Sequence, residues 1–280
     1  MKLLGGRYET LKPIASGGMA TVHLGRAVGV GGFERLVAVK VMHAHIASDP
    51  EFVAMFLDEA RLAARIRHPN VVASLDVQMD EEGLFLIMEF VDGPSLRALQ
   101  QSAQSKREKL PLNVVLRVML DTLAGLHEAH ELTDDEGEGL QLVHRDVSPA
   151  NILIGMDGVG RITDFGVARA ESRLSSTRGG QLKGKIPYMP PEQLLGDRVD
   201  RRCDVYAAGA MLWELMVGKR LYRSDSEGRL VQMILQGPEH TPRQLVPEVP
   251  EALDRVCMNA LANEPSKRYA TAAAFAEALE

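Results

Sequence analysis

The chain has 280 residues, 45% of them hydrophobic and 25% charged, which is enough apolar material for a core and excludes a wholly disordered chain. Its formal net charge of −6 argues against a nucleic-acid-binding protein, which would normally present a basic face. No signal peptide or membrane span is indicated, because the apolar start is very short and the best apolar stretch, 205–217, is also short and contains Glu214. The two cysteines, Cys203 and Cys257, form no paired motif and indicate a reducing compartment. We therefore expect a cytoplasmic protein without membrane contact or disulfides.

The first ninety residues predict strands with one helix among them. Short runs rich in β-branched and apolar residues, separated by glycine-containing or polar turns, predict strands at 7–15, 21–25, 36–42, 71–77 and 84–90. The segment 50–67 instead carries apolar residues at helical spacing, at Phe52, Met55, Phe56, Ala60 and Ala63. A small β-rich unit with one main helix is therefore expected first.

After the run Asp92-Gly93-Pro94 the pattern becomes helical. Helical periodicity predicts helices at 112–131, 204–216, 227–235, 251–261 and 270–279. The acidic stretch 133–139 indicates a surface insertion, with a regulatory surface as the alternative. The chain therefore predicts an α+β fold in which a small sheet lobe precedes a larger, mostly helical lobe.

Several short motifs occur in a specific order. The segment 143–151 reads V-H-R-D-V-S-P-A-N, and D-F-G begins thirteen residues later, at Asp164. Upstream, the run 37–40 reads V-A-V-K, and Glu59 lies nineteen residues after its lysine, on the predicted helix. Each motif alone is a weak signal, but together, over about residues 8–280, the chain resembles the protein-kinase superfamily.

This resemblance implies a single bilobal kinase domain over 1–280. The antiparallel sheet lobe would span 8–88, the hinge 89–93 and the helical lobe 94–280. The domain would use ATP and Mg²⁺ in a cleft between the lobes.

The resemblance also assigns roles to five polar residues. Lys40 would bind the α- and β-phosphates of ATP, and Glu59 would hold Lys40 through an ion pair. Asp146 would accept or orient the proton of the substrate hydroxyl. Asn151 and Asp164 supply the oxygen ligands that Mg²⁺ prefers. Phosphoryl transfer needs such positioning and charge compensation more than covalent chemistry.

The nucleotide loop departs from the family pattern. Of the three glycines in G-x-G-x-x-G, aligned with 15–20, only the middle one is kept, as Gly17, with an additional Gly18 beside it. Alanine is small enough to let a backbone approach phosphates, so we expect a working cover. By the same resemblance, the adenine pocket and hinge would comprise Ile14, Val22, Ala38, Leu153, Glu89 and Val91.

A second departure concerns two residues near the catalytic aspartate. Ser148 stands where serine/threonine kinases normally have lysine, and Lys185 stands where they normally have a threonine that contacts that lysine. We expect the two residues to have exchanged places, with Lys185 delivering the ammonium to the same centre. The alternative is that Ser148 disables the enzyme and Lys185 points to solvent.

Other residues match supporting parts of the family. Glu192 and Arg268 match a buried ion pair that anchors the activation segment, and Asp204 matches a helix aspartate that holds the catalytic-loop backbone. The remaining histidine pairs lack a third ligand at metal-binding spacing, so we expect loop or helix-surface histidines at His43, His45, His127 and His130.

The activation segment contains several hydroxyl residues. In the family, an arginine at the position of Arg145 often pairs with a phosphate on this segment. We expect autophosphorylation there, with Thr177 and Ser176 as the leading sites and an unmodified polar loop as the alternative. A homodimer would allow this reaction in trans.

Pro149 favours serine/threonine rather than tyrosine specificity, since it matches the catalytic-loop pattern of serine/threonine kinases. The resemblance is strongest to bacterial members and implies protein substrates with Ser or Thr acceptors. Ala150 lacks the acidic side chain with which some relatives prefer basic peptides, so no strong arginine requirement is expected. A pseudokinase that serves as a scaffold and a small-molecule phosphotransferase remain as alternatives.

Overall fold

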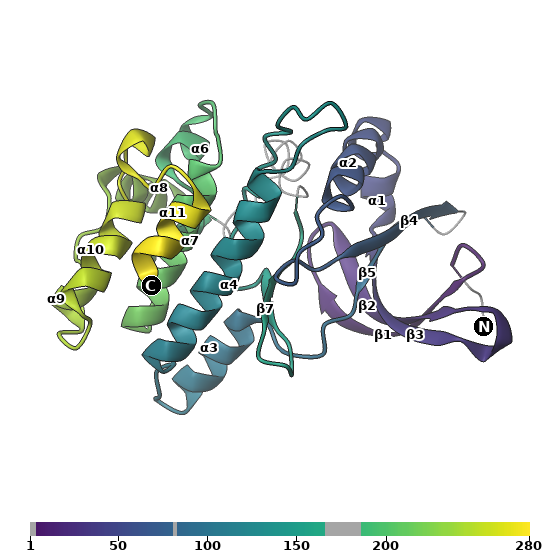
Figure 1. The fold of residues 1–280 in the computed structure, drawn as a ribbon, viewed down its shortest axis with the longest axis horizontal. Coiled ribbons are helices and arrows are strands. Elements are labelled where there is room, and N and C mark those ends of the chain that lie inside the picture. The colour runs from purple at the N-terminus through teal and green to yellow at the C-terminus, as the bar shows by residue number, and fades with distance from the viewer. Residues whose placement is uncertain (1–3, 81–82, 166–185) are drawn as a thin grey trace.

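The computed structural model describes residues 4–80, 83–165 and 186–280. A five-stranded sheet forms one end of the molecule and a group of helices forms the other, with α4 (Leu112–His130) running between them (Figure 1). The expected order of a small sheet lobe followed by a larger helical lobe is confirmed.

The sheet is antiparallel throughout. Its strand order is β1-β2-β3-β5-β4. The strands are β1 Tyr8–Ser16, β2 Ala20–Val28, β3 Glu34–Met42, β4 Ser74–Asp80 and β5 Gly83–Glu89. The strand predicted at 71–77 is wrong at its start, since β4 begins at Ser74 and Val71 forms only an isolated bridge with Ile162.

One face of this sheet is covered by α2 (Pro50–Ala63), which follows the short α1 (Ala44–Ala47). The carboxylate of Asp49 accepts hydrogen bonds from the first turn of α2, whose buried Phe52 and Phe56 pack in the same cluster as Met88 of β5. The helix ends at Ala63, four residues before the predicted end at Arg67. Pro69 follows shortly after and disfavours helical backbone in the residue before it.

The helical lobe is built around α7 (Arg202–Val217), in which every residue from Cys203 to Val217 is buried. The other helices are α3 Leu96–Ser105, α4 Leu112–His130, α6 Pro191–Leu195, α8 Glu227–Gln236, α9 Pro242–Leu245, α10 Glu251–Ala260 and α11 Ala272–Leu279. Both cysteines, Cys203 and Cys257, are buried as free thiols, as small core residues would be. The predicted helices of this lobe are therefore confirmed to within a few residues at each end.

The two lobes join at a segment that packs against a small hairpin, β6 (Ile152–Ile154) and β7 (Gly160–Ile162). A Cβ atom on Gly93 would lie only 1.9 Å from the carbonyl oxygen of Ile154, so this approach requires glycine. The amide of Ile154 also donates to the carbonyl of Pro94 at 2.9 Å. The join is therefore fixed to the hairpin that carries the end of the catalytic-loop motif.

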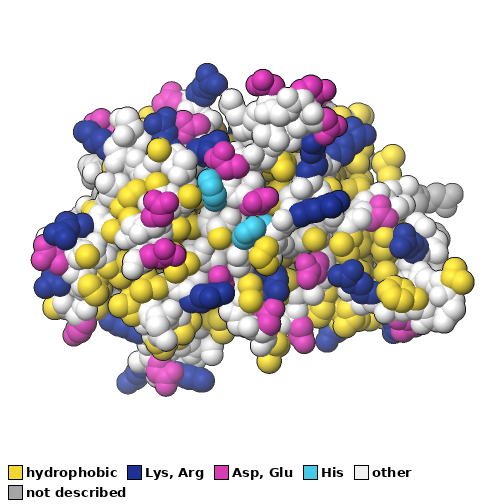
Figure 2. Space-filling view, in the orientation of Figure 1, with side chains coloured by type: hydrophobic (Ala, Val, Ile, Leu, Met, Phe, Trp, Pro, Cys, Tyr) yellow, Lys and Arg dark blue, Asp and Glu magenta, His cyan; other side chains and the backbone are white. Residues whose placement is uncertain are grey.

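The acidic stretch 133–139 is an exposed loop closed by a bridge between Thr133 and Gly139. Arg65, just after α2, donates to the carbonyl of Thr133 and to the carboxylate of Asp135. On the face shown in Figure 2, acidic and basic side chains are interspersed. Among the described residues, no helix is long and apolar enough to cross a membrane.

Candidate active site

Lys40 reaches the space between the lobes from the sheet. Side chains alternate along β3, so Lys40 lies on the same face as Ala38 and Met42, which pack toward α2. Lys40 is only 8% exposed, and its Nζ lies 2.7 Å from Oδ1 of Asp164. A buried ammonium requires such a partner, because taking an isolated charge out of water is costly.

Asp164 is presented on a backbone that few residues adopt. Its φ is +66°, in the left-handed region. The ring of Phe165 packs edge-to-face on His144 at 4.6 Å between centroids, and Nε2 of His144 lies 2.9 Å from the carbonyl of Thr163. These contacts hold both neighbours of Asp164, which stabilises the strained conformation.

Asp146 and Asn151 form a second polar pair. The amide nitrogen of Asn151 donates to the backbone carbonyl of Asp146 at 2.8 Å and to its Oδ2 at 2.9 Å. The carbonyl of Asn151 accepts the backbone N–H of Thr163 at 2.9 Å, which ties this pair to the strand end beside Asp164. Four side chains predicted from three motifs are thus linked by these contacts: Lys40, Asp146, Asn151 and Asp164.

Asp204, in the first turn of α7, holds the backbone of the catalytic loop. Its carboxylate accepts the backbone N–H groups of His144 and Arg145, each at 2.8 Å. Burial alone would raise the pKa of Asp204, but the hydrogen bond and charge of His130 and the contacts with His144 hold that pKa below its ordinary value. Arg145 has φ +65°, so Asp204 anchors a second strained residue beside the catalytic aspartate.

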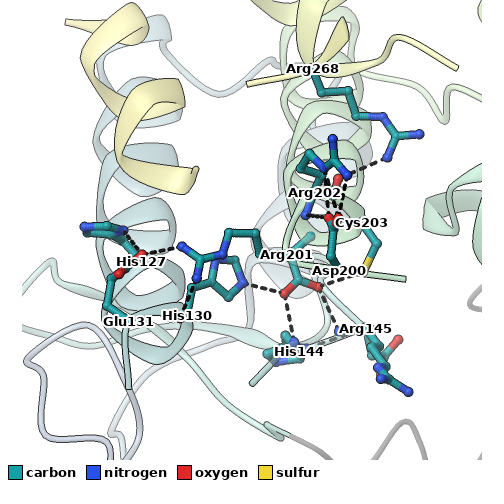
Figure 3. Close-up of polar contacts among 12 residues, drawn as sticks. His127, His130, Glu131, His144, Arg145, Asp200, Arg201, Arg202, Cys203 and Arg268 are labelled. Carbon is teal, nitrogen blue, oxygen red and sulfur yellow. Dashed lines mark hydrogen bonds and ion pairs between the residues drawn. The ribbon is translucent and has the colours of Figure 1, made fainter. Parts of the chain in front are cut away.

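The expectation of a surface histidine is wrong for His130. Its side chain is fully buried, and Nε2 lies 2.8 Å from Oδ2 of Asp204 (Figure 3). Asp204 is 74 residues away in sequence, so spacing alone could not reveal this contact. His43 lies at the other edge of the site. Its backbone N–H donates to the carbonyl of Met19, and its ring Nδ1 lies 3.2 Å from the carbonyl oxygen of Gly18. Sequence reasoning missed this support for the glycine turn.

The glycine turn joins β1 to β2 and is exposed at Gly17 and Gly18. The N–H of Gly17 donates to the carbonyl of Ala20 at 2.9 Å, and a Cβ on Gly17 would make only ordinary contact, at 3.9 Å. This turn therefore does not depend on glycine for space. The alanines found in the family's other glycine positions fit a turn of this kind.

Most of the apolar residues predicted for the adenine pocket belong to one cluster. Ala38 and Val91 are buried in that cluster, and Val22 and Leu153 pack against it. Ile14 is 46% exposed and lies outside that cluster, so the structure does not bring it into this pocket.

A backbone donor at the hinge is suited to bind a nucleotide base. The N–H of Val91 has no hydrogen-bond partner within the described residues, although Val91 is only 9% exposed. Buried backbone donors are nearly always paired, so this group suits an acceptor on a bound molecule such as adenine. The N–H of Glu89, by contrast, donates to the carbonyl of Ala73 at 2.9 Å.

The donor set also fits a magnesium ion. The amide nitrogen of Asn151 is engaged by Asp146, so its amide oxygen is the atom suited to a metal, together with the carboxylate of Asp164. Carboxylate and amide oxygens are hard donors that Mg²⁺ prefers over nitrogen or sulfur. Over residues 4–80, 83–165 and 186–280, no group of three or more His, Cys, Asp or Glu side chains forms a metal-binding cluster.

Some predicted residues fall outside the described part of the structure. Glu59 lies on α2, but its side chain is not among those described, and Lys185, Ser176 and Thr177 lie in the segment 166–185. The described partner of Lys40 is therefore Asp164, and the expected Glu59 pair and the Ser148–Lys185 exchange stay predictions.

The end of the activation segment is fixed by the predicted ion pair. Both guanidinium terminal nitrogens of Arg268 donate to Glu192, at 2.6 and 2.8 Å, and the Arg268 side chain is fully buried. The guanidinium also lies 4.8 Å from the ring centroid of Tyr206. The expected contact of Glu192 with Arg268 is confirmed.

Comparisons with known proteins agree with this site. The family model described as "Protein kinase domain" matches residues 8–279. Tyrosine-protein kinase MasK of Myxococcus xanthus is 43% identical over 98% of this chain and 43% of its own length. Probable serine/threonine-protein kinase PknB of Bifidobacterium longum is 35% identical over 98% of this chain and 39% of its own length. The chain thus spans about two fifths of these relatives.

A solved structure shows the same fold. The kinase domain of PknI from Mycobacterium tuberculosis superposes with a TM-score of 0.74 at 27% identity, covering 97% of this chain and 94% of that one. Together with the buried lysine, the paired Asp146 and Asn151, and the motifs that carry them, these matches lead to one conclusion. The chain belongs to the protein kinase family, among the eukaryotic-like serine/threonine kinase domains of bacteria.

Proposed function

We propose that this chain is an active kinase that transfers the γ-phosphate of ATP to serine and threonine hydroxyls in proteins. The observation that carries the proposal is the 2.7 Å contact between Lys40 and Asp164, beside the Asp146–Asn151 pair. This arrangement sets an ammonium, oxygen donors for a metal and a proton-accepting carboxylate around one centre. Those are the parts that phosphoryl transfer requires.

Each residue has a defined task in this proposal. Lys40 would contact a phosphate of ATP, and Asp164, whose Oδ1 lies 2.7 Å from the Lys40 Nζ, would help to hold Mg²⁺ together with Asn151. When bound, Mg²⁺ supplies positive charge that offsets the phosphate oxygens. Asp146 accepts the hydrogen bond of the substrate hydroxyl and takes its proton as the new P–O bond forms and the bond to the ADP oxygen breaks. Asn151 holds Asp146 in the orientation for this transfer.

Ser148 raises the question of how the transferring phosphate is neutralised. Ser148 is 6% exposed, and its carbonyl accepts the N–H of Asn151 at 3.0 Å, so it lies inside the catalytic loop. We keep the proposal that Lys185 provides the missing ammonium. The variants Ser148→Lys and Lys185→Thr, alone and combined, should show a coupling of about 1–3 kcal/mol in kcat/KM. Strictly additive effects would remove the exchange from the proposal.

Autophosphorylation is the second part of the proposal. Arg145 is partly buried next to Asp146 and is suited to pair with a phosphate on the activation segment. Incubation with ATP and Mg²⁺ followed by mass spectrometry should find phosphate on the peptide that contains Ser176 and Thr177. Finding this peptide unmodified in active protein would contradict this part alone.

Tyrosine phosphorylation is the competing function, because the relative MasK is named a tyrosine-protein kinase. Pro149 in the catalytic loop and the relatives PknB, PrkC and PknL, named serine/threonine kinases, favour Ser and Thr acceptors. Phosphoamino-acid analysis of a generic protein substrate separates the two. Phosphotyrosine as the main product would overturn the proposed acceptor class.

Catalysis itself is tested by comparing wild type with Lys40→Met and Asp146→Asn. Both variants should lose nearly all transfer of labelled phosphate, whereas Lys12→Met, an exposed lysine on β1, should retain it. Wild-type protein that binds ATP without transferring phosphate to protein or small-molecule acceptors would identify a pseudokinase. Transfer only to small hydroxylated molecules would identify a small-molecule phosphotransferase. We also propose that the domain works in the cytoplasm.

A further inference from the structure

A groove of about 950 Å³ lies in the helical lobe, away from the Lys40–Asp164 contact. Its walls come from α3, from the end of α7 with the segment that follows it, and from the end of α8 with the residues beyond. This volume is at the upper end of the range usual for binding sites. The groove is therefore large enough to hold a segment of another molecule.

The groove is lined by four cationic side chains: Arg97, Lys219, Arg220 and Arg223. Within the described residues, no side chain forms an ion pair or hydrogen bond with Lys219, Arg220 or Arg223. Other arginines of the described residues do have a carboxylate within reach, as Arg255 does with Glu251 at 2.8 Å and Arg161 does with Asp157 at 2.7 Å. Three neighbouring unpaired cations on a chain of net charge −6 form a local excess of positive charge.

The carboxylates of the groove do not neutralise this excess. Glu214 is 5% exposed, and its two oxygens accept hydrogen bonds from Tyr188 at 2.6 Å and from Gln100 at 3.4 Å. Glu239 is exposed and lies 3.8 Å from His240. Burial and Glu214 raise the pKa of Tyr188, while the charges of Arg97 and Arg220 oppose this.

The groove adjoins the catalytic loop. The N–H of Arg97, on α3, donates to the carbonyl of Pro149 at 2.8 Å, three residues after Asp146. The guanidinium of Arg97 also donates to the hydroxyl of Tyr188 at 3.3 Å. A protein chain with its acceptor hydroxyl at Asp146 could therefore extend into the groove with its flanking residues.

We propose that this groove binds an acidic segment of the protein substrate, through Lys219, Arg220 and Arg223, and thereby selects acceptors flanked by Asp or Glu. This inference rests on the proposed kinase function and adds the class of substrate. Carboxylates on a flexible segment can reach separate cations one by one, and such pairs act mainly through selectivity and the rate of association. Ala150 adds no acidic group that would attract a basic peptide.

The binding test uses a fluorescent peptide rich in glutamate, with alanine at the acceptor position, and a matched peptide with glutamine in place of glutamate. Wild-type protein should bind the acidic peptide more tightly, with an affinity that falls as salt increases. The double variant Arg220→Glu/Arg223→Glu should weaken binding of the acidic peptide roughly tenfold, because two attractions become repulsions. Arg35 is exposed on β3 and forms no ion pair within the described residues, so Arg35→Glu makes the same kind of charge change elsewhere and should leave binding unchanged.

The kinetic test uses the same peptides with threonine at the acceptor position. The double variant should raise KM for the acidic peptide roughly tenfold while kcat, and the kinetics of the glutamine peptide, stay within about twofold. Equal binding of both peptides by wild type, or an acidic preference that survives the double variant, would overturn the inference and leave the kinase function standing. Equally tight, Arg220-dependent binding of a single-stranded oligonucleotide would also overturn it, by showing a general polyanion surface. Charge-dependent peptide binding without any phosphate transfer would support the groove and refute the kinase function.

Discussion

Replacing Arg268 by lysine should destabilise the helical lobe strongly, although the charge is retained. The guanidinium uses all five of its N–H donors. Two go to Glu192, and the others go to the carbonyls of Ala262, Arg202 and Asn263 at 2.7–3.1 Å. A lysine ammonium has only three donors on one nitrogen, so at least two acceptors would lose their partner. At about 1.5–3 kcal/mol for each hydrogen bond to a charged group, the loss of two should be about 3–6 kcal/mol.

The matched control is the neighbouring Lys267, which pairs with Glu264 at 2.7 Å but is 66% exposed. Lys267→Ala should change the free energy of unfolding by no more than about 1 kcal/mol, because exposed ion pairs contribute little. Urea unfolding can be followed through the single tryptophan, Trp213, which is buried in α7. Equal free-energy losses for Arg268→Lys and Lys267→Ala would refute the reasoning.

A double-mutant cycle tests the pair itself. Glu192→Gln should cost about 3–5 kcal/mol, because it leaves the buried guanidinium without its counter-charge. Combined with Arg268→Lys, the two losses should fall short of additivity by about 1–3 kcal/mol. Additivity within about 0.5 kcal/mol would show that Glu192 and Arg268 stabilise the lobe independently.

Three further outcomes follow from the structure. Gly93→Ala should destabilise the join between the lobes by about 1–3 kcal/mol, since its Cβ would overlap the carbonyl of Ile154. Urea unfolding would measure this against Gly139→Ala, whose Cβ would meet nothing within 4 Å. The pKa of Asp204 is lowered in the folded state, so its stabilisation is present above the unfolded pKa of about 3.9 and is lost as the pH falls through the folded pKa. The free energy of unfolding should therefore fall less steeply with decreasing pH in Asp204→Asn than in wild type over that acid range. The same pH profile in both proteins would contradict this. Tyr188→Phe should cost about 1–3 kcal/mol, because the buried carboxylate of Glu214 loses its 2.6 Å donor. Thermal unfolding should show this as a lower Tm, and an unchanged Tm would contradict it.

Much of the secondary structure could be predicted from local patterns. The run of β-branched and apolar residues in β3 and the helical spacing of α2 are properties of neighbouring residues, so the sequence alone shows them. Helix α3 was missed because only Leu96 and Gln100 are buried along it, which leaves a weak apolar signal. Its importance comes from position, since it places Arg97 beside the catalytic loop.

The sequence by itself determined which residue types were available for chemistry: Lys40, Asp146, Asn151 and Asp164 stand in motifs whose order indicates a kinase. Only the tertiary structure decided which side chains meet. Lys40 and Asp164 are 124 residues apart yet form a 2.7 Å contact, and His130 is buried because α7 brings Asp204 to it. Whether a charge is paired depends on distances between segments far apart in the chain, which no local pattern contains. The sequence therefore could not show that Lys219, Arg220 and Arg223 have no ion-pair partner among the described residues.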